Sequence, residues 1–279
     1  MALTYEARVL RVLQTIHDHP ASDLSLDALA DCASVSRFHW HRVFRAMTGE
    51  TCAQAVRRIR LTLAATWLLS REEPVAVIAR DCGYPHMPSF VRAFSQRFGV
   101  SPVVFRRTRP TIVCPPPTTR GCFTMFPVEI DQSQARRLGA LPHTGAYEGI
   151  GPVFDQVSTL ATEHGLWPSV RGMVGVHYDD PSAVAETELR SHAGVWVADN
   201  TPLPAPLEEL LLPASACAVL HYKGPYEAIK VAYDYLYGDW LPRSGREPAD
   251  NPPYELYLNS PHDTPSGELL TDIVLPLVA

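Results

Sequence analysis

Apolar residues recur every three to four positions along the first 110 residues, which is the spacing of amphipathic helices. Helices are predicted over residues 5–19, after Ser25, after Ser36, over residues 52–70, after Pro74 and around Pro88. Serine suits the start of a helix because its hydroxyl accepts a hydrogen bond from a free backbone N–H, and proline suits the first turn because it has no N–H to lose. The front part of the chain is therefore predicted to be all-helical.

Part of this helical region occurs twice, fifty residues apart and without a gap. The segment Asp31–Gly49, DCASVSRFHWHRVFRAMTG, matches Asp81–Gly99, DCGYPHMPSFVRAFSQRFG, and the match aligns Arg42 with Arg92. Repetition at one fixed spacing marks a duplicated structural unit. Each copy has the pattern of the turn and second helix of a helix-turn-helix, and the helix over residues 52–70 would be a rigid connector between the two.

The back part of the chain alternates apolar and polar residues, which is typical of strands. A second repeat lies here: HTGAYEGIGPVFDQV from His143 matches YKGPYEAIKVAYDYL from Tyr222, 79 residues later. Each copy is predicted to be a strand, a turn at a glycine, a helix and two further strands. The duplicated β-α-β-β modules would form one antiparallel sheet with two main helices and a cleft where the halves meet.

Charge separates the two parts of the chain. Residues 1–110 contain 15 arginines and no lysine against 9 acidic residues, whereas residues 111–279 contain 9 basic and 21 acidic residues. Only the basic front part suits nucleic acid. We predict domains at 1–109 and 123–279, joined by a proline-rich linker at 110–122. Because no apolar leader or membrane span is visible, we expect a cytoplasmic protein without a membrane partner.

The front part resembles the AraC/XylS family of bacterial transcription regulators over nearly all of residues 5–107. The resemblance covers both repeated units, the connector with RRIRLTLAATWLL, and the closing G-x-S-P-x-x-F-R at Gly99–Arg106. It implies a seven-helix domain with two helix-turn-helix units, each inserting one helix into DNA. A promoter duplex is then the expected partner, with RNA polymerase as a possible second partner.

Arginine is the side chain best suited to a guanine edge, so Arg42 and Arg92 are the leading candidates for base contacts. The full set of residues expected to contact DNA is Ser36, Arg37, Phe38, His41, Arg42, Arg45, His86, Ser89, Arg92 and Ser95. The second unit has Pro88 and Val91 where the first has Phe38 and His41, so it offers fewer hydrogen-bond donors. We therefore predict that the first unit reads sequence more stringently.

The back part resembles the GyrI-like effector-binding domain over about residues 123–279. The motif H-x-G-x-Y occurs intact from His143 to Tyr147 and again as Y-x-G-x-Y from Tyr222 to Tyr226, and the tail YELYLNSPHDTPSGELLTDIVLPL is also typical. The resemblance implies a pocket for aromatic or amphipathic, often cationic, molecules around a buried glutamate. The residue at the matching position is Glu255.

Strand alternation places Tyr257 on the same face as Glu255, with Gly175 and His177 at the corresponding places of the first copy. A buried carboxylate needs a partner, and a cationic ligand with aromatic walls would supply one. The predicted ligand-binding residues are Glu255, Tyr257, Tyr147, Tyr226, Trp196, His177 and Trp240.

No cofactor or metal site is expected, because no cysteine or histidine spacing fits zinc and no phosphate-binding loop is present. Two other functions stay open at this point. Some GyrI-like proteins resemble this domain and hydrolyse reactive small molecules, although Gly175 leaves only one carboxylate in the pseudo-symmetric pair. Alternatively, the acidic back part could be an adaptor that binds another protein.

Overall fold

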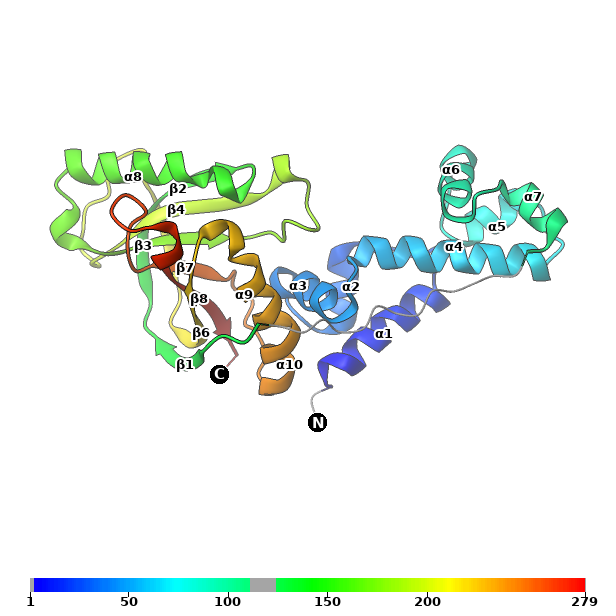
Figure 1. Cartoon of the computed structure of the whole chain (residues 1–279), viewed down its shortest axis with the longest axis horizontal. Helices are drawn as coiled ribbons and strands as arrows, with labels where there is room; N and C mark the ends of the chain where they lie inside the picture. Colours follow the sequence, from blue (N-terminus) through cyan, green and yellow to red (C-terminus); the bar gives the residue numbers. More distant parts are fainter. Residues whose placement is uncertain (1–2, 111–123, 279) are drawn as a thin grey trace. The chain divides into compact units, whose positions relative to one another are not determined.

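The computed structural model describes residues 3–110 and 124–278 (Figure 1). By its internal contacts the chain divides into two compact units. Among the described residues, the first unit contains 3–34 and 47–110, and the second contains 35–46 and 124–278. The predicted linker, apart from Pro110, lies outside the described residues. No helix in residues 3–110 and 124–278 is both long and apolar enough to span a membrane.

The front part contains the seven helices that the family resemblance implies. They are α1 (Tyr5–Asp18), α2 (Leu26–Ala33), α3 (Arg37–Thr48), α4 (Cys52–Ser70), α5 (Val75–Asp81), α6 (Met87–Phe98) and α7 (Pro102–Thr108). Side-chain caps set several of their starts, because a free backbone N–H finds an oxygen there. The Ser25 hydroxyl accepts from the N–H of Ala28, and Thr51 and Gln54 form a reciprocal capping box at the start of α4.

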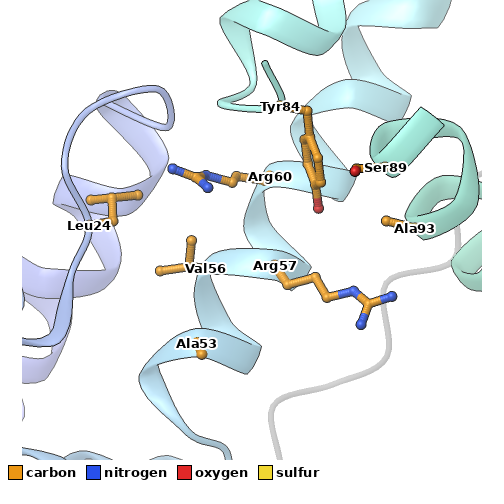
Figure 2. A pocket seen from close by; sticks show the side chains of 8 residues that line it. All are labelled: Leu24, Ala53, Val56, Arg57, Arg60, Tyr84, Ser89 and Ala93. Atoms are coloured by element: carbon orange, nitrogen blue, oxygen red, sulfur yellow. The ribbon is translucent and has the colours of Figure 1, made fainter. Parts of the chain in front are cut away.

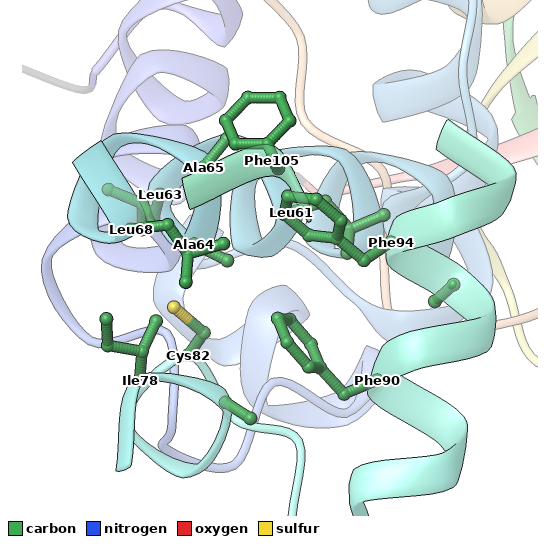
Figure 3. Packing of buried hydrophobic residues seen from close by; sticks show 12 residues of the cluster. Leu61, Leu63, Ala64, Ala65, Leu68, Ile78, Cys82, Phe90, Phe94 and Phe105 are labelled. Atoms are coloured by element: carbon green, nitrogen blue, oxygen red, sulfur yellow. The ribbon is translucent and has the colours of Figure 1, made fainter. Parts of the chain in front are cut away.

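Helices α4 to α7 share an aromatic core within the first unit (Figure 3). Phe90 and Phe94 of α6 are fully buried, and Phe94 makes an edge contact with Phe105 of α7 at 5.2 Å between ring centroids. The turn between α5 and α6 needs glycine: Gly83 has φ +81°, and a Cβ there would lie 2.4 Å from the Pro20 carbonyl oxygen. Apolar packing therefore fixes α6, the second predicted DNA-reading helix.

The second unit contains one eight-stranded antiparallel sheet in the order β1-β6-β8-β7-β3-β4-β2-β5. The strands are β1 (Val128–Ser133), β2 (Arg136–Thr144), β3 (Val170–His177), β4 (Arg190–Val197), β5 (Glu208–Leu212), β6 (Ser215–Lys223), β7 (Tyr254–Tyr257) and β8 (Leu270–Leu277). The prediction of one antiparallel sheet built from two copies of a module is confirmed.

Each module has one strand more than predicted. β1 precedes β2 and β5 precedes β6, and the modules exchange these strands, because β1 pairs with β6 and β5 pairs with β2. Both extra strands are largely exposed, so they lack the strong alternation that marks a half-buried strand. The exchange ties the two halves of the sheet together at both edges.

The helices of the second unit are α8 (Gly151–Glu163), α9 (Lys230–Tyr235), a π-helical turn η5 (Leu236–Trp240) and α10 (Leu241–Ser244). Short 3₁₀ turns are η1 (Tyr147–Ile150), η2 (Trp167–Ser169), η3 (Glu186–Glu188), η4 (Tyr226–Ala228) and η6 (Ser266–Glu268). Val157 and Ala161 of α8 pack against Val195 of β4. Because Phe154 of α8 contacts β7 and Tyr233 of α9 bonds to the same strand, both helices cover one face of the sheet.

Most of α3 groups with the second unit, which also contains α9 and η5. Trp40, Val43 and Phe44 of this helix are fully buried. His39 and His41 are buried as well, although His41 was expected to contact DNA. The outer face of α3 is thus occupied in this structure, and the partners that occupy it are described below.

Candidate effector site and DNA-reading helices

Two equivalent glycine turns place a tyrosine beside the sheet in each module. Gly145 has φ +131° and Gly224 has φ +150°, a region that favours glycine, and their N–H groups donate to the carbonyls of Leu189 and Leu269. Each turn leads from a strand directly into a 3₁₀ helix that begins with Tyr147 or Tyr226. This geometry explains the repeated G-x-Y motif.

Glu255 lies on β7 at the centre of the sheet, directly opposite Gly175 of β3. It is 6% exposed, so its charge must be compensated by neighbours. The Tyr257 hydroxyl donates to Oε2 at 2.8 Å and the Tyr233 hydroxyl donates to Oε1 at 2.9 Å. His177 places Nε2 3.5 Å from Oε2, which is too long for a good hydrogen bond.

These neighbours keep the glutamate ionised. Burial alone would raise the pKa of Glu255, but the nearby His177 and the hydroxyls of Tyr257 and Tyr233 outweigh it, so its pKa lies below the ordinary value. Burial and then the Glu255 charge raise the pKa of both tyrosines well above 10. At neutral pH the site is therefore a carboxylate held by two protonated phenols.

Aromatic rings surround this carboxylate. Tyr257 makes edge contacts with Phe154 at 5.2 Å and with Tyr226 at 5.4 Å, and Tyr147 makes an edge contact with His177 at 4.6 Å. Both ring nitrogens of His177 are buried without a hydrogen-bond partner among the described residues. The site therefore combines one negative charge, several aromatic rings and an unsatisfied polar ring.

Gly175 makes room for this arrangement. A Cβ at this position would lie 2.7 Å from the Tyr257 hydroxyl oxygen and 3.1 Å from His177 Nε2. Any larger side chain would displace the tyrosine that donates to Glu255. The space that a side chain at Gly175 would take is thus filled by the ring of Tyr257 from the second module.

Five of the seven predicted ligand-binding residues meet in this cluster: Glu255, Tyr257, Tyr147, Tyr226 and His177. The placement predicted for Trp196 is wrong. Alternation along β4 turns its ring to the opposite face of the sheet, where it packs near Tyr254 and under the guanidinium of Arg136. Trp240 ends the η5 turn and is partly exposed.

Sequence reasoning missed Phe154 and Tyr233. The 79-residue repeat aligns these two residues with each other, one helical position before the matched pair Asp155 and Asp234. Both stand on the helix that follows the G-x-Y turn, so the repeat contained the signal. Both lie on the side of their helix that faces the sheet, so assigning the faces of the two predicted helices would have identified them.

The predicted DNA-contacting residues of α3 make contacts within the second unit. The Ser36 hydroxyl donates to Asp250 Oδ1 at 2.6 Å. Arg42 donates from Nη2 to the Asp179 carbonyl at 2.8 Å, and its guanidinium carbon lies 4.7 Å from the ring centroid of Tyr233 and 5.8 Å from that of Tyr237. Of the other four, Arg37 is exposed, Phe38 and Arg45 are half-buried and His41 is buried.

Charge favours this position for Arg42. Desolvation opposes the charged form, but Tyr237, Tyr233, Asp180 and Tyr147 more than offset it, so the pKa of Arg42 is raised above its ordinary value. The guanidinium therefore stays charged while partly buried among aromatic rings. Its Nε has no hydrogen-bond partner among the described residues.

The matching residues of α6 differ in exposure. His86, Ser89 and Arg92 are exposed and Ser95 is half-buried. Ser89 also lines a cavity of about 460 Å³ in the first unit, together with Leu24, Ala53, Val56, Arg57, Arg60, Tyr84 and Ala93 (Figure 2). Arg57 reaches across to Gln96 of α6 at 2.6 Å.

The second unit has a cavity of about 310 Å³ between the end of α8 and the loop before β5. None of the predicted ligand-binding residues lines it; the lining residues are His164, Gly165, Leu166, Ser169, Thr201, Pro202, Leu203 and Pro204. Within residues 3–110 and 124–278, no group of three or more histidine, cysteine, aspartate or glutamate side chains could hold a metal ion.

Comparison with known proteins identifies both parts. Residues 29–108 match a helix-turn-helix domain family. The regulatory protein SoxS of Salmonella typhimurium is 30% identical over 104 residues, which are 37% of this chain and 97% of SoxS. The C-terminal domain of AraT from Geobacillus stearothermophilus is 35% identical over 38% of this chain and 88% of that one, with a TM-score of 0.35.

Residues 126–278 match the GyrI-like small molecule binding domain. A DNA gyrase inhibitor of Yersinia enterocolitica is 32% identical over 136 residues, which are 47% of this chain and 85% of the inhibitor. Both resemblances predicted from the two internal repeats are confirmed. The chain belongs to the GyrI-like family and joins its small-molecule-binding domain to an N-terminal DNA-binding region of the AraC type.

Proposed function

We propose that this DNA-binding regulator responds to a small aromatic or amphipathic cation that binds at Glu255. The observation that carries the proposal is a buried carboxylate kept ionised by Tyr233 and Tyr257 and ringed by Tyr226 and Phe154. A cation placed among these rings would gain both charge pairing and attraction to the aromatic faces. His177 Nδ1, which has no hydrogen-bond partner among the described residues, would offer a further polar contact to the ligand.

The DNA side of the proposal rests on the two repeated helices. The residues that would contact a promoter duplex lie on α3 and α6 or directly before them: Ser36, Arg37, Phe38, His41, Arg42 and Arg45 in the first repeat, and His86, Ser89, Arg92 and Ser95 in the second. RNA polymerase would be a protein partner at that promoter, and the cytoplasm would be the place of action. Fluorescence anisotropy should show tighter binding to the protein's own promoter region than to random duplex at moderate salt.

Thermal unfolding of the full chain tests the effector site. Tetraphenylphosphonium is an aromatic cation, and triphenylphosphine oxide is a neutral aromatic molecule of similar shape. At a hundredfold excess over Kd, a ligand adds about 2.7 kcal/mol of stability, which is a rise of several degrees in Tm. We expect that rise only with the cation, and we expect Glu255→Gln to abolish it.

Glu208→Gln is the matched control, because Glu208 is an exposed carboxylate of the same unit on β5. It should respond to tetraphenylphosphonium as the wild type does. Equal shifts in wild type and Glu255→Gln would place the ligand elsewhere and defeat the proposal.

A further inference from the structure

The surroundings of Arg42 have the composition of a binding site for a planar cation. The ring of Tyr233 lies under the guanidinium at 4.7 Å, the ring of Tyr237 lies beside it at 5.8 Å, and the Asp179 carbonyl accepts from Nη2 at 2.8 Å. Tyr233 and Tyr237 are parallel to within 6°. Two aromatic faces and a carbonyl oxygen are the groups that recognise a delocalised cation.

This cation position and the Glu255 site share side chains. Tyr233 donates its hydroxyl to Glu255 while its ring face takes Arg42. Tyr147, which contacts His177 by its ring edge, donates its hydroxyl at 2.9 Å to the same Asp179 carbonyl that accepts from Arg42. A ligand that moves either tyrosine therefore disturbs Arg42, and Arg42 already uses part of the surface that a cationic ligand needs.

Two more contacts hold α3 in this position. The His39 ring is buried, and its Nε2 faces the carbonyl oxygens of Ala249 at 3.0 Å and Asn251 at 2.9 Å. Because carbonyls only accept, Nε2 carries the proton and Nδ1 accepts from the Tyr237 hydroxyl at 2.8 Å. The exposed pair of Ser36 and Asp250 closes the N-terminal end of the helix.

The same face of α3 is the one predicted to read DNA. A guanidinium that donates to Asp179 and stacks on Tyr233 has neither the position nor the free edge to grip a guanine. The Ser36 hydroxyl is likewise committed to Asp250. The arrangement of α3 in this structure and DNA reading by α3 therefore exclude each other.

We propose that Arg42 is a built-in occupant of the effector site, and that the effector carries a planar delocalised cation, such as an amidinium or guanidinium, which displaces it. Displacement frees α3 from the second unit and makes its DNA-reading face available. The inference rests on the proposed function, since it names the ligand class and the regulation of the same site. We call the state in which α3 is free of the second unit the released state. Ligand and DNA both favour this state, so each strengthens the binding of the other.

The test uses variants on the effector side, because Arg42 itself is a predicted DNA contact. Tyr237→Leu removes a ring beside Arg42 and the hydroxyl that bonds to His39, while both hydroxyl partners of Glu255 stay. Tyr237→Phe keeps the ring and removes only the hydroxyl. Tyr222→Leu is the matched control, a buried tyrosine of the same unit whose hydroxyl donates to Pro225.

Two measurements on the full-length chain test the inference: promoter binding and hydrogen exchange. Binding to a labelled promoter duplex should be about tenfold tighter for Tyr237→Leu and about threefold tighter for Tyr237→Phe, since apparent affinity rises with the fraction of competent protein. Tyr222→Leu should bind like the wild type. Hydrogen exchange of α3 amides should speed up in wild type with benzamidine, an aromatic amidinium, but not with neutral benzamide.

The possible outcomes separate the two proposals. If the wild type prefers its promoter but Tyr237→Leu binds it no better than Tyr222→Leu, α3 is not restrained and this inference is overturned. If benzamidine and benzamide act alike on α3 exchange, the proposed ligand class is rejected. Absence of any promoter preference, in wild type and all variants, would instead overturn the proposed function.

Discussion

Helices α3 and α6 come from one repeated segment, yet the structure treats them differently. Arg42 of α3 is stacked on Tyr233 and hydrogen-bonded to Asp179, whereas Arg92, its counterpart fifty residues later, is exposed. Helix α6 is held by Phe90 and Phe94 in an apolar core that leaves its polar face to solvent. Helix α3 has both its apolar and much of its polar face covered.

The difference shows that two positions equivalent in sequence can differ in function when only one of them meets a partner surface. Position 42 and position 92 have the same residue type and the same place on a helix. Only the first meets a surface with aromatic faces and an acceptor carbonyl. Tyr237, Tyr233 and Asp180 offset the desolvation of its guanidinium, which therefore stays charged there. In the proposed mechanism, the second unit acts on one of the two helices expected to read DNA, while the other stays available to hold DNA.

The largest effect that tests this comparison is on sequence discrimination. Each arginine that grips a guanine supplies about 1 to 3 kcal/mol of discrimination. We expect Arg42→Ala to lower the ratio of promoter to random-duplex affinity more than Arg92→Ala, because α6 offers Pro88 and Val91 where α3 offers Phe38 and His41.

Anisotropy titrations with both duplexes measure this ratio, and benzamidine present throughout would place the wild type and both variants in the released state. Arg97→Ala is a suitable control, since Arg97 is an exposed arginine of α6 outside the predicted contact set. Equal losses for Arg42→Ala and Arg92→Ala would mean that the two helices read DNA alike.

Much of the fold could be predicted from periodicity and repetition. The connector helix α4 has the predicted bounds, Cys52–Ser70, because a threonine cap precedes it and its apolar stripe continues to its end. Each repeat was predicted to begin with a strand that ends at a glycine turn, and β2 and β6 are these strands. The exchanged strands β1 and β5 were missed because pairing between modules, and not their own composition, defines them.

The site was only partly predictable, for a related reason. Strand alternation correctly grouped Glu255 with Tyr257 and opposite Gly175. Alternation alone does not say which face of β4 meets Glu255. The pairing of Gly175 with Ala193 sets that face, and alternation along β4 then places Trp196 on the side of Tyr254. The burial of His39 and Arg42 depends on contacts more than 130 residues apart in the chain, and no local pattern contains them.

Acidity should loosen α3 but not α6. Burial, and then the charge of Arg42, lowers the pKa of His39 to about 4, while the same ring freed from the second unit would titrate near 6.5. Because the pKa is lowered when α3 is packed on the second unit, this packing has its full stability above pH 6.5. Its free energy of stabilisation falls by about 1.4 kcal/mol for each pH unit below 6.5, down to about pH 4. Asp250, which also faces this ring, opposes the shift only in part.

Hydrogen exchange of α3 relative to α6 in the same sample measures this loss and cancels the intrinsic pH dependence of exchange. Going from pH 7.5 to 5.5 should raise the relative exchange of α3 about tenfold. Burial lowers the pKa of His41 too, so His39→Gln should reduce the effect without abolishing it. A pH response of His39→Gln equal to that of the wild type would assign the effect to other groups.

The smallest effect concerns the exposed hydrogen bond between Ser36 and Asp250 at 2.6 Å, which has a counterpart on α6 in the bond of Arg57 to Gln96 at the same distance. A hydrogen bond contributes about 0.5 to 1.5 kcal/mol, and an exposed one lies at the low end of that range, so Asp250→Ala should speed α3 exchange about two- to threefold. Asp250→Asn keeps an acceptor oxygen and removes the charge, and should change exchange less. Gln96→Ala should leave the exchange of α3 amides unchanged, because the bond of Gln96 belongs to α6, which the second unit does not hold. If Gln96→Ala sped up α3 exchange as much as Asp250→Ala does, both helices would be loosened in general and the asymmetry between them would disappear.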